Sequence, residues 1–67
     1  MAIHYRKYGD LLIMCMERHY STFTMEQLGL IARTTNNGNQ VIDKMIALCK
    51  ESKTEKEFLQ EVQKKYL

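Results

Sequence analysis

The sequence of 67 residues contains no proline and no tryptophan, and it has only three glycines. Its β-branched residues are scattered and do not alternate with polar residues, as they do in a half-buried strand. We therefore expect one all-α domain over residues 1–67, a compact bundle of three to four short helices. A domain of this size buries only about 60% of the surface that its unfolded chain exposes, so its stability margin is thin.

Long apolar runs are also absent. The longest extends from Leu11 to Met16, far below the roughly 20 residues that a membrane span requires. The N-terminal segment lacks the apolar core and the small-residue cleavage site of a signal peptide. These features predict a soluble, cytoplasmic protein without a membrane partner.

Charge of one sign does not dominate. Ten basic and eight acidic side chains leave a net charge of +2, which by itself predicts neither a nucleic-acid nor an acidic-lipid partner. The two histidines are not accompanied by a glycine-rich phosphate loop or by a paired acid and base at helical spacing. We therefore expect a non-enzymatic protein without a cofactor or a small-molecule substrate.

The two cysteines, Cys15 and Cys49, lie in apolar helical patterns, where free cysteine behaves as a small hydrophobe. Reduced, buried thiols are the favoured interpretation, and a disulfide between them is an alternative. A second alternative is a metal site, because His19 lies four residues from Cys15 and His4 offers a distant fourth ligand. Structural zinc sites usually supply their ligands in close pairs, so we assign no metal ligand.

Apolar periodicity predicts four helices, at about residues 8–20, 24–34, 39–50 and 54–66. The first is apolar on nearly every side between Leu11 and Met16, which predicts burial from more than one direction. The third carries two adjacent apolar lines and therefore a wide apolar face. These lines contain Val41, Met45 and Leu48, and Ile42, Ile46 and Cys49.

Helix starts are marked by capping patterns. Thr24 with Gln27 has the spacing of a capping box, and Phe23 with Leu28 has the spacing of a hydrophobic staple, so we expect Thr24 to cap the second helix.

Two later helices carry similar signals. Asn39 is expected to cap the third helix, after an Asn-Gly pair that closes the second. Thr54 with Glu57 is expected to cap the fourth, and Ser52 with Glu55 is a competing start.

The order of the segments "HYSTFTMEQLGLIA" and "NGNQVIDKMIALCKE" resembles that of the helix-turn-helix families over about residues 11–51. The resemblance rests on the cap before the second helix, on the Leu28-Gly29 pair, and on Val41 and Met45 as inward positions. It implies DNA binding, because the recognition helix of those families meets base edges in the major groove. The residues in reach would be Arg33, Asn37, Asn39, Gln40, Lys44 and Lys50.

Protein contact is the function that we favour. The small size, the apolar first helix and the mixed charge of the fourth suit a regulator that docks onto a larger protein or onto its own copy. Such a regulator would be an adaptor, an inhibitor or a transcription-associated factor. A homodimer is compatible with protein contact and with DNA binding. Tyrosine joins apolar area to a polar tip and is a natural anchor. The expected anchors are Tyr5, Tyr8, Tyr20 and Tyr66, together with Phe23.

Overall fold

A computed structural model describes residues 5–66, with Tyr5 described by its backbone alone. The fold consists of α1 (Tyr5–Glu17), α2 (Thr22–Thr34), α3 (Gly38–Glu51) and α4 (Glu55–Tyr66). Residues 5–66 contain no strand, and the expected all-α bundle of short helices is confirmed. None of the helices in this range has the length and the apolarity needed to cross a membrane.

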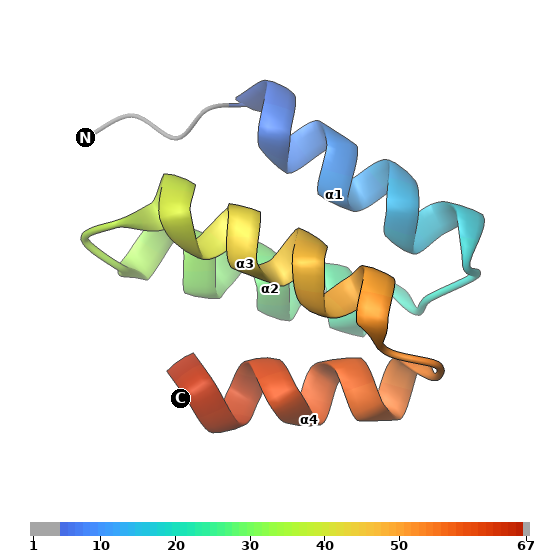
Figure 1. The fold of residues 1–67 in the computed structure, drawn as a ribbon. Helices are drawn as coiled ribbons and strands as arrows, with labels where there is room; N and C mark the ends of the chain where they lie inside the picture. Colours follow the sequence, from blue (N-terminus) through green and yellow to red (C-terminus); the bar gives the residue numbers. More distant parts are fainter. Residues whose placement is uncertain (1–4, 67) are drawn as a thin grey trace.

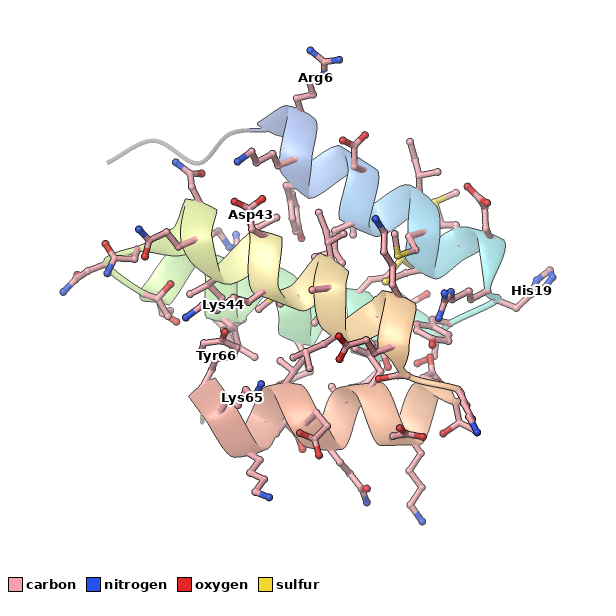
Figure 2. All side chains as sticks on the ribbon, viewed as in Figure 1. Arg6, His19, Asp43, Lys44, Lys65 and Tyr66 are labelled. Atoms are coloured by element: carbon pink, nitrogen blue, oxygen red, sulfur yellow. The ribbon has the colours of Figure 1, made fainter. Side chains whose placement is uncertain are left out.

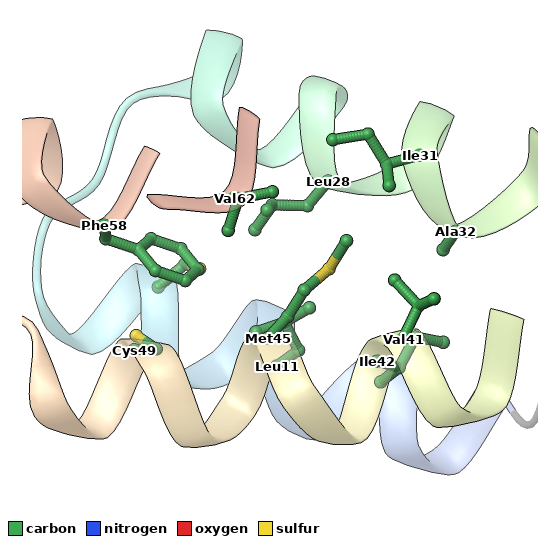
Figure 3. Packing of buried hydrophobic residues seen from close by; sticks show 11 residues of the cluster. Leu11, Leu28, Ile31, Ala32, Val41, Ile42, Met45, Cys49, Phe58 and Val62 are labelled. Carbon is green, nitrogen blue, oxygen red and sulfur yellow. The ribbon is translucent and has the colours of Figure 1, made fainter. Parts of the chain in front are cut away.

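Helix α3 lies at the centre of the bundle. It packs against α1, α2 and α4, and Figure 1 shows it between α1 and α4 with α2 behind it. The wide apolar face that the sequence predicts for this helix serves these three contacts, because Val41, Ile42, Met45 and Cys49 are all buried. Figure 3 shows how they meet side chains of the other helices. The buried apolar residues are Leu11, Cys15, Leu28, Ile31, Ala32, Val41, Ile42, Met45, Cys49, Phe58 and Val62.

The central pair of helices, α2 and α3, is joined by residues 35–37 and runs antiparallel, one helix alongside the other (Figure 1). This is the arrangement of an αα-hairpin. In a helix-turn-helix, the two helices meet at about 90–120°. The resemblance to that family therefore extends to the order of the helices and not to their relative orientation.

Helix α1 begins and ends about three residues earlier than expected. Its end is a Schellman motif, in which His19 N–H donates to the Met16 carbonyl at 3.0 Å and Tyr20 N–H donates to the Cys15 carbonyl at 2.9 Å. His19 has the left-handed backbone conformation that this motif requires, with φ of 59°. Glycine usually occupies that position, so the sequence carries no signal for the turn.

The prediction that α1 is buried from more than one direction is wrong. Leu11 and Cys15 are buried, whereas Ile13 and Met16 are 54% and 61% exposed. The physical reason is that α1 packs mainly against α3, on one side of the bundle. Within the described part of the chain, no helix covers Ile13 and Met16.

The cap of α2 is Ser21 and not Thr24, so the helix begins at Thr22. Ser21 Oγ accepts a hydrogen bond from Thr24 N–H at 3.3 Å, and Ser21 N–H donates to the Glu55 carboxylate. Thr24 is buried in the first turn, while Phe23 is exposed and forms no staple. The capping residue Ser21 and the residue that donates to it, Thr24, are three residues apart, and with this start Thr24 packs against the core.

The cap of α3 also differs from expectation. Asn37 takes the cap position, without a side-chain cap bond, and the helix begins at Gly38. Asn39 therefore lies in the first turn. Val41 N–H donates to the Asn37 carbonyl at 3.0 Å, and this start leaves Val41 and Ile42 facing the core.

Thr54 caps α4 as expected, because its Oγ1 accepts from Glu57 N–H at 3.1 Å. Ser52 instead ends α3, and its N–H donates to the Leu48 carbonyl at 2.8 Å. Arg18, in the loop between α1 and α2, contacts the end of α3. Its Nη1 donates to the carbonyl of Cys49 and to the carbonyl of Ser52, the latter at 3.2 Å. This cation thereby satisfies carbonyl groups at the negative end of α3.

Candidate protein-binding surface

Among the described residues, the exposed large apolar side chains all belong to α1 and α2. Ile13 and Met16 lie on α1, and Phe23 and Leu30 on α2 are 58% and 47% exposed. Single exposed apolar residues are common on protein surfaces, but several that gather on one side mark an interaction site.

A groove of about 460 Å³ runs between α1 and α2. Its apolar lining comes from Tyr8 and Leu12 on α1 and from Met25 and Gly29 on α2, and its polar lining consists of Thr22, Glu26 and Arg33. Because α2 lies behind α3 in Figure 1, the outer side of α2 is on the far side of that view.

The sequence spacing connects the groove with the exposed residues. Positions 23, 26, 30 and 33 are three or four residues apart, so they share the side of α2 that faces away from the buried Leu28 and Ile31. On α1, Met16 is one turn from the groove residue Leu12. We call this surface the α1–α2 face. It consists of Tyr8, Leu12, Met16, Thr22, Phe23, Met25, Glu26, Gly29, Leu30 and Arg33.

Of the tyrosines expected as anchors, the three whose side chains the structure describes do not lie together. Tyr8 lines the groove of the α1–α2 face. Tyr20 is half-buried and stacks on Phe58, with ring centroids 5.8 Å apart and planes at 28°, so it closes the core. Tyr66 is half-buried at the junction of α3 and α4, beside Lys44 and Leu48 (Figure 2). The side chain of Tyr5 lies outside the described residues.

The six residues expected to read DNA are divided between two surfaces. Arg33 lies at the rim of the α1–α2 groove, where its Nε donates to the Gly29 carbonyl at 3.3 Å. The other five belong to the start and the outer side of α3. Of these, Asn39 is half-buried, while Asn37, Gln40, Lys44 and Lys50 are exposed.

The outer side of α3 has balanced charge. Its exposed residues include Asp43 and Glu51 as well as Lys44 and Lys50. Asp43 also forms a salt bridge of 3.0 Å with Lys7 of α1. A DNA-binding surface usually carries a dense basic footprint, and this side of α3 offers as many acidic as basic groups.

The two cysteines are free and buried, as expected for small core residues. Burial, reinforced by the neighbouring Cys49, raises the pKa of the Cys15 thiol to about 12. Burial also raises the pKa of Cys49, although nearby Arg18 opposes the shift. His19 is exposed and points away from the bundle in Figure 2, and His4 lies outside the described residues. Within residues 5–66, no three histidine, cysteine or acidic side chains gather as metal ligands.

The residues of this face that the sequence interpretation missed include Met16, Glu26 and Leu30. A signal for the last two was present, because Phe23 with Leu30 and Glu26 with Arg33 are each seven residues apart and repeat on one side of α2. Whether that side faces a neighbouring helix or solvent follows only from the packing. Comparison of the chain with models of protein families, with curated proteins and with solved structures finds no match.

Proposed function

We propose that the chain is a small, non-enzymatic, cytoplasmic regulatory protein that binds another protein chain through the α1–α2 face. The observation that supports this proposal is that three of the four exposed large apolar side chains among the described residues, Met16, Phe23 and Leu30, lie on this face. An adaptor, an inhibitor or a transcription-associated factor would act through such a contact.

The shape of the face favours a protein ligand. Apolar side chains line a groove between two helices, and polar groups of Thr22, Glu26 and Arg33 border it. An apolar centre with a polar rim is typical of protein interfaces, and grooves between helices commonly receive an amphipathic helix. Covering Met16 and Leu30 would remove apolar area from water, which is the main favourable term in association.

The proposal is tested by affinity capture from the native host with the wild-type protein and with Leu30→Glu. The variant places a charge at the centre of the face, so we expect the partner to be lost. Gln60→Glu is the matched control, because it adds the same charge at an exposed position of α4. Circular dichroism checks that the variants keep their helices. Recovery of the same partner by wild type and by Leu30→Glu would overturn the proposal.

DNA binding is a second candidate, supported by the exposed amides of Asn37 and Gln40 beside the start of α3. Amides of this kind form paired hydrogen bonds with adenine. Titration into random duplex DNA at low salt and again at about 200 mM salt tests it, because phosphate contacts make affinity fall steeply with salt. No binding at low salt excludes this candidate. If binding occurs, Gln40→Ala should relax sequence preference, whereas Lys50→Ala should weaken all sequences alike.

A further inference from the structure

We infer that the partner of the α1–α2 face is a second copy of this chain, with α2 of each copy packed antiparallel against α2 of the other. The inference rests on the proposed function, because it uses the same face. It follows from the positions of Glu26, Leu30 and Arg33 on that face.

Glu26 and Arg33 carry opposite charges at the rim of the groove. They are seven residues apart, so they lie on the same side of α2 and about 10 Å from each other along its axis. Within residues 5–66, neither side chain takes part in a salt bridge. The Arg33 hydrogen bond to the Gly29 carbonyl uses Nε and leaves the terminal nitrogens of the guanidinium for a carboxylate.

Two-fold symmetry makes this pattern complementary to itself. In a symmetric dimer, a residue that faces a second residue of the partner is matched by the reverse contact. If the axis crosses antiparallel α2 helices midway between positions 26 and 33, Glu26 of each copy faces Arg33 of the other. Leu30 lies half a residue from that midpoint and is 47% exposed. It therefore packs against Leu30 of the second copy, at the centre of the interface.

The size of the face sets the expected affinity. Each of α1 and α2 has 13 residues and is therefore about 20 Å long, and packed helices lie about 8–10 Å apart. A face of two such helices is at the small end of specific interfaces, where association is weak and reversible. We expect a dissociation constant on the order of micromolar.

Sedimentation analysis between about 1 µM and 1 mM protein tests the dimer. We expect wild type and the Gln60→Glu control to change from monomer to dimer with rising concentration. Leu30→Glu brings two like charges together at the axis and should remain monomeric. A wild type that is monomeric over the whole range, or a Leu30→Glu variant that dimerises like wild type, would overturn the inference.

Charge reversal tests the orientation of the two copies. Glu26→Arg and Arg33→Glu each place like charges against each other twice, so each variant alone should dimerise at least about tenfold more weakly. An equimolar mixture of the two variants should recover the dimer, because arginine in one copy again faces glutamate in the other. Failure of the mixture to recover, with both variants folded by circular dichroism, contradicts this pairing.

The outcomes also separate the two proposals. A monomeric wild type that still captures a different protein, and loses it on Leu30→Glu, overturns the second copy as partner and leaves the proposed function standing. A monomeric wild type that captures nothing through this face overturns both.

Discussion

The hydroxyl group of Tyr8 occupies the space in which a side chain at Gly29 would begin. A β-carbon built at position 29 meets this hydroxyl oxygen below any normal contact distance, and it lies 3.4 Å from the ring carbon that carries the oxygen. Glycine at this position therefore allows the Tyr8 ring to approach α2 closely at the α1–α2 groove, which both residues line. The contact links the two helices on which the proposed interface depends.

Substitution of Gly29 by alanine should destabilise the protein by about 1 kcal/mol. Alanine improves helix propensity by about 1 kcal/mol, but displacing a packed ring typically costs about 1–3 kcal/mol. Urea denaturation measures the change. In a Tyr8→Phe background the offending oxygen is absent, so the same substitution should be neutral or stabilising. Equal effects in the two backgrounds would show that Tyr8 does not limit this position.

Replacement of Phe58 by alanine should remove a large part of the free energy of unfolding, as measured by urea denaturation. Phe58 is fully buried and stacks on Tyr20, and loss of such a ring costs about 3–5 kcal/mol. A chain of this length has only about 3–10 kcal/mol of stability in total. Phe23→Ala makes the same chemical change at an exposed position and should keep the helical circular dichroism signal. Similar losses in the two variants would contradict the assigned core.

The cap of α2 is tested by two substitutions of one residue. Ser21→Ala removes the oxygen that accepts from Thr24 N–H and should cost about 1 kcal/mol. Ser21→Gly should cost only a few tenths of a kcal/mol, because glycine tolerates the cap conformation. Denaturant midpoints give both values. An alanine variant as stable as wild type would mean that the helix starts elsewhere.

His19 offers a site for stabilisation. Its left-handed backbone, with φ of 59°, costs free energy for a residue with a β-carbon and costs little for glycine. His19→Gly should therefore raise the free energy of unfolding by about 0.5–1 kcal/mol, although the more flexible unfolded chain offsets part of the gain. Thermal unfolding followed by circular dichroism shows the shift. A lower melting temperature would contradict the strained turn.

Alkaline pH should weaken the fold through Cys15. Its pKa is about 12 in the folded protein, against 9.0 for a free thiol. Between these values the unfolded chain loses the proton while the folded chain keeps it, so stability is complete below about pH 9 and falls as the pH rises toward 12. Denaturation at pH 8, 9 and 10 should show a shallower decline in Cys15→Ala, in which the other titrating groups remain. Equal declines in both proteins would argue against the buried thiol.

Apolar spacing alone was enough to predict the helices and most of the core. The expected bounds of α3 and α4 lie within one residue of the observed ones, and Thr54 caps α4 through the local spacing that the sequence displays. These features depend on neighbours a few residues away, so a sequence pattern contains them. The predicted cap of α2 was wrong, because the capping-box spacing at Thr24 is only a local pattern, whereas the burial of Thr24 in the core favours the earlier start at Ser21.

The candidate surface depended on contacts that are distant in the sequence. Tyr8, Tyr20 and Tyr66 are chemically alike, yet only the packing of the helices places Tyr20 on Phe58 and Tyr8 at the groove. The apolar residues of α1 likewise exceed what one neighbouring helix can cover, so the tertiary structure decided that Met16 is exposed while Cys15 is buried. The sequence by itself determined which segments become helices, because helix formation and capping are local. Only the tertiary structure decided which apolar side remains open, because burial depends on how many helices surround each one.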